Sequence, residues 1–150
     1  MNYCIDLIAK EEYPAVLDVW ETSVRATHHF LKEEDIAFFK PLILNEYLGA
    51  VELRCMRTQP GKIIGFLGVA SNNLEMLFLH PDYHGQGLGK LMLDYAKEQM
   101  EIKYVDVNEQ NAWAVGFYQH EGFEVYKRSA LDSLGKPYPI LHMQLSTFGI

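Results

Sequence analysis

Apolar and polar positions follow two different periods along the chain, and the change of period marks the predicted elements. Alternation bounded by turn residues predicts β-strands over residues 3–9, 51–56, 63–70, 74–79, 104–107, 123–128 and 140–145. Apolar residues at helical spacing predict α-helices over residues 10–27, 32–49, 88–100 and 108–120. A turn over Gln59, Pro60, Gly61 and Lys62 makes a hairpin of two of these strands. The order predicts one α/β (α+β) domain, residues 1–150, in which helices cover the faces of a mixed sheet.

Length and composition fit a single globular domain. The chain has 150 residues, of which 49% are hydrophobic, and its mean hydropathy is −0.10. No apolar run approaches the roughly 20 residues that a membrane-spanning helix needs, and residues 1–6 lack the pattern of a signal peptide. We therefore expect a cytoplasmic protein without a membrane partner, in which the lone cysteines Cys4 and Cys55 are reduced and buried.

The charge balance argues against nucleic acid as a partner. The net charge is −7, and the 13 lysine and arginine residues form no basic cluster. Binding to a phosphate backbone needs such a cluster, so we expect no nucleic-acid partner. An acidic surface attracts a cationic, amine-bearing substrate, although the same charge also keeps a protein soluble.

A glycine-rich loop follows the strand predicted over residues 74–79. Residues 84–90 read His-Gly-Gln-Gly-Leu-Gly-Lys and lead into the helix predicted from Leu88. Glycines leave backbone N–H groups uncovered, and a helix N-terminus carries partial positive charge, so this pattern predicts a phosphate-binding loop. The structural alternative is that the glycines only start a helix.

Two common phosphate-binding loops do not match these residues. The nucleoside-triphosphate P-loop needs Gly where His84 stands and Ser or Thr where Leu91 stands. The dinucleotide fingerprint needs its third Gly where Lys90 stands, and it opens the first strand–helix unit of its domain.

Two motifs carry a family resemblance. His84–Gly89 resembles the pyrophosphate loop of the GNAT superfamily of acetyl-CoA-dependent N-acetyltransferases: Arg or Gln, two residues, Gly, one residue, then Gly or Ala. Gly87 and Gly89 match, whereas His84 departs from the first position. Downstream, Asn111-x-x-Ala-x-x-Phe-Tyr118 followed by Gly-Phe is similar to the family's second motif. The resemblance extends over nearly the whole chain. Residues 26–28, 108–111 and 128–139 also resemble one group of small bacterial acetyltransferases of undefined substrate.

The resemblance implies the GNAT fold, a mixed and mostly antiparallel central sheet of six to seven strands with about four helices, splayed between strands 4 and 5. It implies acetyl-CoA (coenzyme A) as the cofactor, with its pantetheine arm on the fourth strand and its pyrophosphate on the loop. The implied cofactor-binding residues are Leu77, Leu79, His84, Gly85, Gln86, Gly87, Leu88, Gly89, Lys90 and Asn111. Ordinary alternatives exist: the leucines as core residues, Lys90 as an exposed helix lysine and Asn111 as a helix cap.

The implied reaction is direct transfer of the acetyl group to a primary amine of a small molecule or a protein. Tyr118 stands where the family keeps its general acid, and its alternative is a half-buried core tyrosine. Glu75 is the candidate base, acting through water. By alternation it shares a side of its strand with Leu77 and Leu79, and a charge within an apolar strand indicates a wet cleft. Its alternative is a solvated glutamate.

The acceptor site is predicted where the family builds it, at the join of the first two helices and in the last loop. Thr27, His28 and Tyr138 are the candidate substrate residues, whereas Trp113 and His120 are expected to be surface or packing residues. No metal is implied, and the chain is expected to be a monomer or a homodimer. The alternatives are a non-catalytic acyl-CoA-binding module and a different CoA ester as donor.

Overall fold

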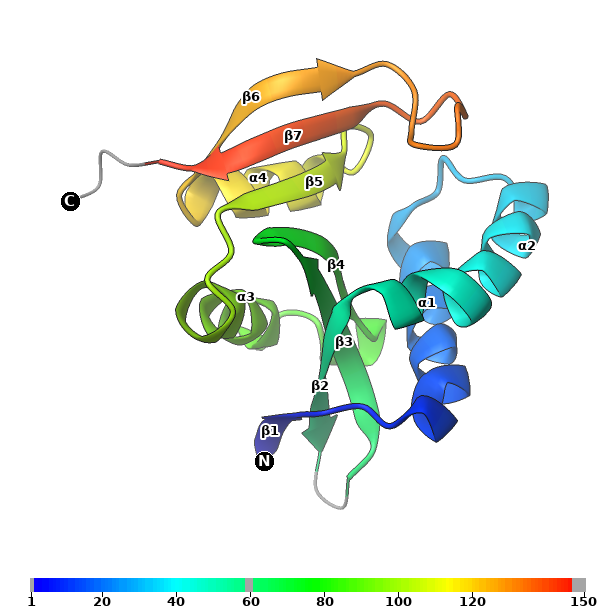
Figure 1. Cartoon of the computed structure of the whole chain (residues 1–150), viewed down its shortest axis with the longest axis vertical. Coiled ribbons are helices and arrows are strands. Elements are labelled where there is room, and N and C mark those ends of the chain that lie inside the picture. The colour runs from blue at the N-terminus through cyan, green and yellow to red at the C-terminus, as the bar shows by residue number, and fades with distance from the viewer. Residues whose placement is uncertain (1, 59–60, 147–150) are drawn as a thin grey trace.

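The computed structural model describes residues 2–58 and 61–146, so Gln59 and Pro60 of the predicted turn lie outside the described residues. Within this part of the chain one sheet has seven strands: β1 (Tyr3–Asp6), β2 (Glu52–Thr58), β3 (Ile63–Ala70), β4 (Asn73–Leu79), β5 (Tyr104–Asn108), β6 (Phe123–Ser129) and β7 (Ile140–Leu145). Their order is β1-β2-β3-β4-β5-β7-β6, and only β4 and β5 are parallel (Figure 1). The predicted mixed, mostly antiparallel sheet is confirmed.

The α-helices of the described residues are α1 (Tyr13–Thr27), α2 (Glu33–Leu42), α3 (Leu88–Gln99) and α4 (Ala112–His120). Short turns flank them: 3-10 helices η1 (Lys10–Glu12), η3 (Leu48–Ala50) and η4 (Pro81–Tyr83), and the π-helical η2 (Ile43–Tyr47). The helix predicted over residues 32–49 is confirmed as one run of helical turns over residues 33–50, but the predicted end of the α-helix is wrong, because η2 and η3 form the second half of this run. Pro41 lies inside α2 and has no N–H for the helical ladder, and the chain widens into η2 two residues later.

Two other predicted boundaries are also wrong, because polar residues end or cap the elements. The first strand ends at Asp6 rather than at residue 9. The helix predicted from Asn108 begins at Ala112, since Asn108 still belongs to β5 and Asn111 is the N-cap of α4.

Strands β4 and β5 pair only where they begin. Asn73 is opposite Tyr104 and Leu74 is opposite Val105, and no further pair joins these two strands within the described residues. Beyond this point they diverge (Figure 1). The later residues of β4 pair with β3 on one side, and their other edge faces the gap. The predicted splay between the fourth and fifth strands is confirmed.

Each face of the sheet has its own apolar core. Helices α3 and α4 cover one face, where Met92 is fully buried. Helices α1 and α2 cover the other, where Phe66 is fully buried. Successive residues of β4 contribute to opposite cores, with Leu77 against the first and Phe78 against the second. Strand β4 therefore lies between both helical layers, directly beside the gap.

None of the helices in the described ranges combines the length and apolar character that a membrane crossing requires. Both cysteines are free thiols. Cys55 is buried, as predicted, and burial raises the pKa of its thiol to about 11. The prediction that Cys4 is buried is wrong, because the alternation of the edge strand β1 turns it outward.

Candidate active site

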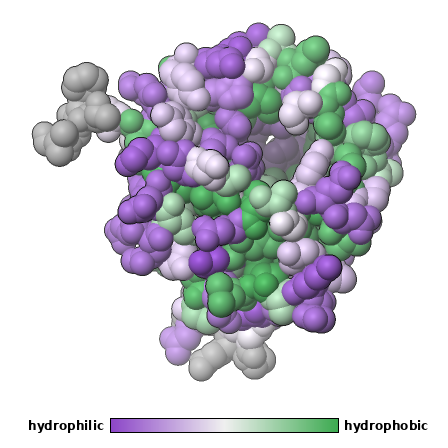
Figure 2. All heavy atoms as spheres, in the orientation of Figure 1, coloured by the Kyte–Doolittle hydropathy of each residue, from purple (hydrophilic) through white to green (hydrophobic). Residues whose placement is uncertain are grey.

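Two grooves meet where β4 and β5 diverge. The loop groove, about 590 Å³, lies between residues 84–90, β4 and α4. The sheet groove, about 570 Å³, lies between β4, β5, β7 and the loop after β6. Residues common to both linings are His28, Leu77, Phe78, Asn111, Ala114 and Tyr118. Figure 2 shows a hollow in this face of the molecule between the loop after β6 and the α1–α2 segment. Two ligands entering by different grooves can therefore meet at the splay.

The glycine-rich loop has the backbone shape of an anion cradle. Gly85 and Gly87 have φ angles of +80° and +78°, and Gly87 immediately precedes α3. A Cβ atom at either position would have no atom within 4 Å, so the backbone is uncovered there. The first N–H groups of α3 have no partner inside the helix and carry partial positive charge. These features fit the pyrophosphate of acetyl-CoA.

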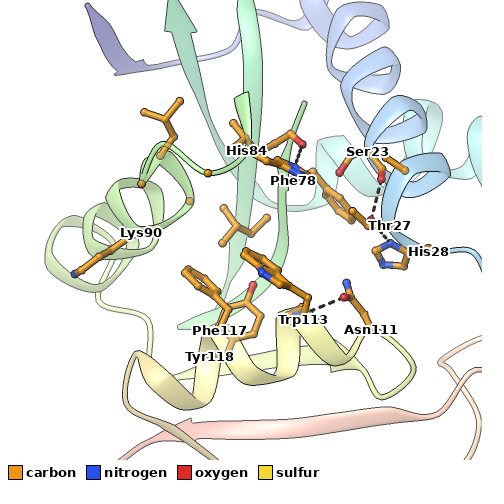
Figure 3. A pocket seen from close by; sticks show the side chains of 18 of the residues that line it. Ser23, Thr27, His28, Phe78, His84, Lys90, Asn111, Trp113, Phe117 and Tyr118 are labelled. Atoms are coloured by element: carbon orange, nitrogen blue, oxygen red, sulfur yellow. Dashed lines mark hydrogen bonds between the residues drawn. The ribbon is translucent and has the colours of Figure 1, made fainter. Parts of the chain in front are cut away.

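The polar side chains of this loop are already hydrogen-bonded within the protein. The pairs are His84 Nε2 to the Leu79 carbonyl (2.9 Å), the Tyr3 hydroxyl to Gln86 Oε1 (2.9 Å), and Lys90 Nζ to Asp94 Oδ2 (2.9 Å) and Glu121 Oε1 (3.3 Å). Lys90 is part of the lining, although its side chain extends away from Trp113 and Tyr118 in Figure 3, and Gln86 is not part of the lining. These side chains already have partners within the protein, whereas the backbone at Gly85 and Gly87 is uncovered.

The free edge of β4 and the start of α4 form the remaining walls of the loop groove. Leu77 and Leu79 line it, and both pack against the α3–α4 core, so their core interpretation is confirmed. Asn111 Oδ1 accepts the Ala114 N–H at 3.2 Å, which confirms the cap interpretation. Contacts of these residues with the cofactor stay predictions.

Tyr118 lies at the junction of the two grooves. Its ring is 7% exposed and packs edge-on against Phe117 and Phe123, with centroids 5.3 and 5.8 Å apart. Its hydroxyl points into the groove (Figure 3). Burial raises the pKa of the phenol well above its usual range, so the group keeps its proton at neutral pH. The ring is therefore part of the core, and the protonated hydroxyl faces the splay.

A β-bulge places Glu75 differently from the prediction. The β3–β4 register shifts by one residue here, which leaves Glu75 without a partner on β3. Leu74 packs in the same core as Leu77 and Leu79, whereas Glu75 lines the sheet groove beside Met76. The expectation that Glu75 shares a side with Leu77 and Leu79 is therefore wrong, because the bulge interrupts the alternation.

The surroundings of Glu75 favour its protonated form. Desolvation in the groove raises the pKa of this carboxyl above its ordinary value, and the charge of Asp106 adds to the rise. A hydrogen bond with Asn73 acts in the opposite direction. A carboxylate with a raised pKa is a stronger base than an ordinary carboxylate.

A hydrogen-bonded chain that the sequence did not predict crosses three strands beside Glu75. Ser129 Oγ is 2.7 Å from His142 Nε2, and His142 Nδ1 is 2.7 Å from Asp106 Oδ1. All three line the sheet groove. They are far apart in the sequence, and strand pairing brings them together: β5–β7 pairing sets Asp106 opposite His142, and β6–β7 pairing sets Ser129 opposite Ile140, two residues from His142. Within the described ranges no group of three or more His, Cys, Asp or Glu side chains is placed to hold a metal ion.

The structure brings the three predicted substrate residues close together, because His28 and Tyr138 line one space and Thr27 is hydrogen-bonded to His28. Thr27 and His28 end α1 and line the loop groove, and His28 also reaches the sheet groove. Tyr138 is buried and lines a third space, the helix groove of about 190 Å³, between α1, α2 and β4. Its hydroxyl donates to Asp35 on α2, so it fastens the last loop to that helix.

Trp113 is a groove residue that sequence analysis missed. It is 75% exposed and stacks on Phe117 with ring planes 6° apart, and both rings line the loop groove. The four-residue spacing of the two aromatics on one helix was the available signal. His120, by contrast, is a surface residue as expected.

A family match agrees with this geometry. The family model described as "Acetyltransferase (GNAT) domain" matches residues 48–125. The chain is 38% identical over 133 residues to the peptidyl-lysine N-acetyltransferase YjaB of Salmonella typhimurium, covering 89% of this chain and 91% of that protein. The chain therefore belongs to the GNAT family and is an acetyl-CoA-dependent N-acetyltransferase.

Solved structures agree with the fold. The solution structure of apo-form YjaB from Escherichia coli superposes with a TM-score of 0.87 and 34% identity, covering 97% of this chain and 98% of that one. The PaiA N-acetyltransferase of Thermoplasma acidophilum, in complex with coenzyme A, gives a TM-score of 0.75 at 23% identity and covers 97% and 100% of the two chains. The second likeness concerns the fold alone.

Proposed function

We propose that the chain acetylates lysine side chains of proteins, and that Tyr118 and Glu75 handle the protons. Relatives 38% and 35% identical to it, from Salmonella typhimurium and Escherichia coli, are named peptidyl-lysine N-acetyltransferases. The observation that carries the proposal is that Tyr118 and Glu75 line the same groove at the splay.

The charge of the sheet groove supports a cationic acceptor. The carboxylates lining it belong to Glu75, Asp106 and Asp132, and its described lining contains no lysine or arginine. Such a groove attracts an ammonium group by Coulomb forces, which act more strongly here than across open solvent.

Bound acetyl-CoA supplies the acetyl group as a thioester. We infer that the backbone N–H groups of residues 85–90 hold its pyrophosphate and that Leu77 and Leu79 offer backbone groups to the pantetheine arm. Beyond Leu74, the edge of β4 that faces β5 has no strand partner within the described residues, and the loop backbone is uncovered at Gly85 and Gly87. Asn111, already fixed as a cap, lies beside the same groove.

Two proton movements complete the proposed reaction. A lysine ammonium has an ordinary pKa of about 10.4, so it must lose a proton before its nitrogen can attack. Glu75 accepts that proton, directly or through water, because its own pKa is raised. Tyr118 donates a proton to the departing sulfur, because burial keeps its hydroxyl protonated. Acid–base groups of this kind typically contribute roughly 10²- to 10⁴-fold to the rate.

The test is acetyl transfer to lysine-containing peptides, measured by thiol release, with mass spectrometry to locate the acetyl group. We expect modification of the lysine Nζ and a higher kcat/KM than for polyamines, aminoglycosides or N-terminal amines. Preference for one of those amines would overturn the lysine proposal. Acetyl-CoA binding without turnover on any amine would favour the acyl-CoA-binding module instead.

Substitutions test the two assigned roles. Tyr118→Phe and Glu75→Gln are each expected to lower kcat by roughly 10²-fold, while the affinity for acetyl-CoA changes little. The matched surface controls are Tyr104→Phe and Glu124→Gln, which are expected to retain wild-type kcat. Wild-type turnover by Tyr118→Phe would leave Tyr118 as a packing residue.

A further inference from the structure

His28 occupies the place where all three grooves meet. It lines the loop groove, the sheet groove and the helix groove, and Phe78 is its neighbour in each. Its ring lies 5.2 Å from the Phe30 ring and 6.2 Å from the Phe78 ring, measured between centroids. Its backbone N–H closes the last turn of α1 on the Val24 carbonyl at 2.7 Å. The imidazole is therefore held in position by a helix end and two aromatic rings.

The hydrogen bonds of Thr27 fix which nitrogen of this ring carries the proton. Thr27 Oγ1 lies 2.8 Å from the Ser23 carbonyl and 2.7 Å from His28 Nδ1 (Figure 3). A carbonyl oxygen only accepts, so the single hydroxyl proton of Thr27 goes to Ser23. The bond to His28 then needs a donor on the ring. Both contacts are satisfied together only when Nδ1 carries the proton and Thr27 accepts it.

This tautomer leaves Nε2 of His28 as a bare hydrogen-bond acceptor. No other residue of the described ranges hydrogen-bonds the ring, and the one buried side-chain nitrogen or oxygen of these ranges without a partner is Asn108 Oδ1, so Nε2 is accessible from the grooves that His28 lines. Burial lowers the pKa of His28 to about 4, with a smaller contribution from the charge of His29, so the ring is neutral at physiological pH. An uncharged acceptor at the junction of the grooves suits a ligand that brings an N–H donor.

We propose that His28 Nε2 accepts a hydrogen bond from the acceptor amine and so aims its lone pair at the acetyl group. The proposal rests on the amine acetylation proposed above. A deprotonated primary amine has two N–H bonds and one lone pair. When one N–H is fixed on Nε2, the lone pair is left free for attack. The opposite tautomer would donate to the lone pair and block the nucleophile. Thr27 is thus a positioning residue, and His28 touches the substrate.

The tautomer is tested first, on the wild-type protein without substrate. Nitrogen-15 NMR of the histidine rings distinguishes a protonated nitrogen from a bare one, and His28→Gln identifies the His28 signals by their loss. We expect a protonated Nδ1 and a bare Nε2 at neutral pH. A protonated Nε2 would overturn the proposal whichever amine the enzyme acetylates, so this result is separate from the identity of the acceptor.

Matched variants then test the role on whichever amine the wild type acetylates best. Thr27→Ser keeps the hydroxyl and is expected to stay within about threefold of wild-type kcat/KM for the amine, whereas Thr27→Val is expected to lose roughly 10- to 100-fold through misplacement. His28→Gln keeps an acceptor near the Nε2 position, whereas His28→Asn keeps only a donor near Nδ1. The kcat/KM for the amine is therefore expected to be higher for His28→Gln than for His28→Asn. Equal values within either pair would overturn the proposal. The rise of melting temperature with acetyl-CoA, expected in all four variants, verifies folding and cofactor binding.

Discussion

His84 and Leu79 are joined by a hydrogen bond of 2.9 Å between the imidazole Nε2 and the backbone carbonyl that ends β4. A carbonyl only accepts, so Nε2 carries a proton and is already committed to the protein. The bond ties the first residue of the glycine-rich loop to the strand before it. His84, which stands where the GNAT pattern has Arg or Gln, therefore helps to shape the loop in this chain.

His84→Ala is expected to weaken coenzyme A binding by roughly threefold, the effect of losing one ordinary hydrogen bond. The loss is small because the backbone N–H groups of the loop remain in place. Isothermal titration calorimetry measures the Kd, with His120→Ala, an exposed substitution on α4, as the control. A loss far beyond tenfold would instead assign His84 a direct phosphate contact.

Gly87→Ala is expected to damage the same loop more severely. The φ of +78° at this position costs an L-residue about 1–2 kcal/mol. We expect the free energy of unfolding to fall by about 1 kcal/mol in urea titrations, and coenzyme A to bind roughly tenfold more weakly. Gly116→Ala is the contrasting control, because Gly116 lies inside α4 with open space around it. Alanine at this position is expected to stabilise the helix by about 0.5–1 kcal/mol. Equal effects of the two substitutions would contradict the strained-loop argument.

The fold was largely predictable from the sequence because most elements have a clear period and sharp ends. The glycine-rich loop and the Asn111–Tyr118 segment are each one short stretch of sequence. Their local patterns were therefore enough to predict that both line the cofactor groove. The change from α-helix to the wider η2 at Ile43 could not be predicted, because the apolar positions keep their helical spacing through both parts.

Parts of the site that depend on strand register could not be predicted. Asp106 and His142 are neighbours only because β5 and β7 pair in one register. The side on which Glu75 lies depends on a bulge opposite β3, and strict alternation gave the wrong side. Tyr138 lines a groove together with His28 and Glu75, and its role as a wall of the acceptor site stays a prediction. The hydrogen bond from its hydroxyl to Asp35 is a long-range pair without a local signal in the sequence.

Asp35→Asn is expected to loosen the last loop and to change how stability depends on pH. Asp35 accepts hydrogen bonds from the Tyr138 hydroxyl and from Lys136 Nζ at 2.9 Å, and these bonds, in that order, lower its pKa. A lowered pKa in the folded state gives stability that is present above the unfolded value and is lost as the pH falls through the folded one. Melting curves should therefore show a smaller loss of stability on acidification for the variant than for the wild type.

The same substitution should affect the acceptor more than the cofactor. The loop that Asp35 anchors contributes Asp132 to the sheet groove, whereas none of its residues lines the loop groove. We expect the KM for the amine to rise by roughly three- to tenfold and the KM for acetyl-CoA to stay constant. Asp18→Asn, on the exposed side of α1, is the control. A parallel rise of both KM values would indicate general destabilisation.

Asp106→Asn is expected to move the pH profile of the reaction through its effect on Glu75. Desolvation is the larger cause of the raised pKa of Glu75, and the Asp106 charge is the cause that a substitution can remove. Asparagine keeps an oxygen that can accept the His142 Nδ1 proton, so the Asp106–His142 hydrogen bond can persist without the charge. The pKa of Glu75 then falls, and a base with a lower pKa is deprotonated at lower pH, so the rising limb of kcat/KM against pH shifts toward acid. Asp82→Asn, an exposed change of the same charge, is the control and leaves the limb in place. If the limb stays where it is in Asp106→Asn and also persists in Glu75→Gln, the group that titrates is not Glu75, and proton removal falls to water or to the amine itself.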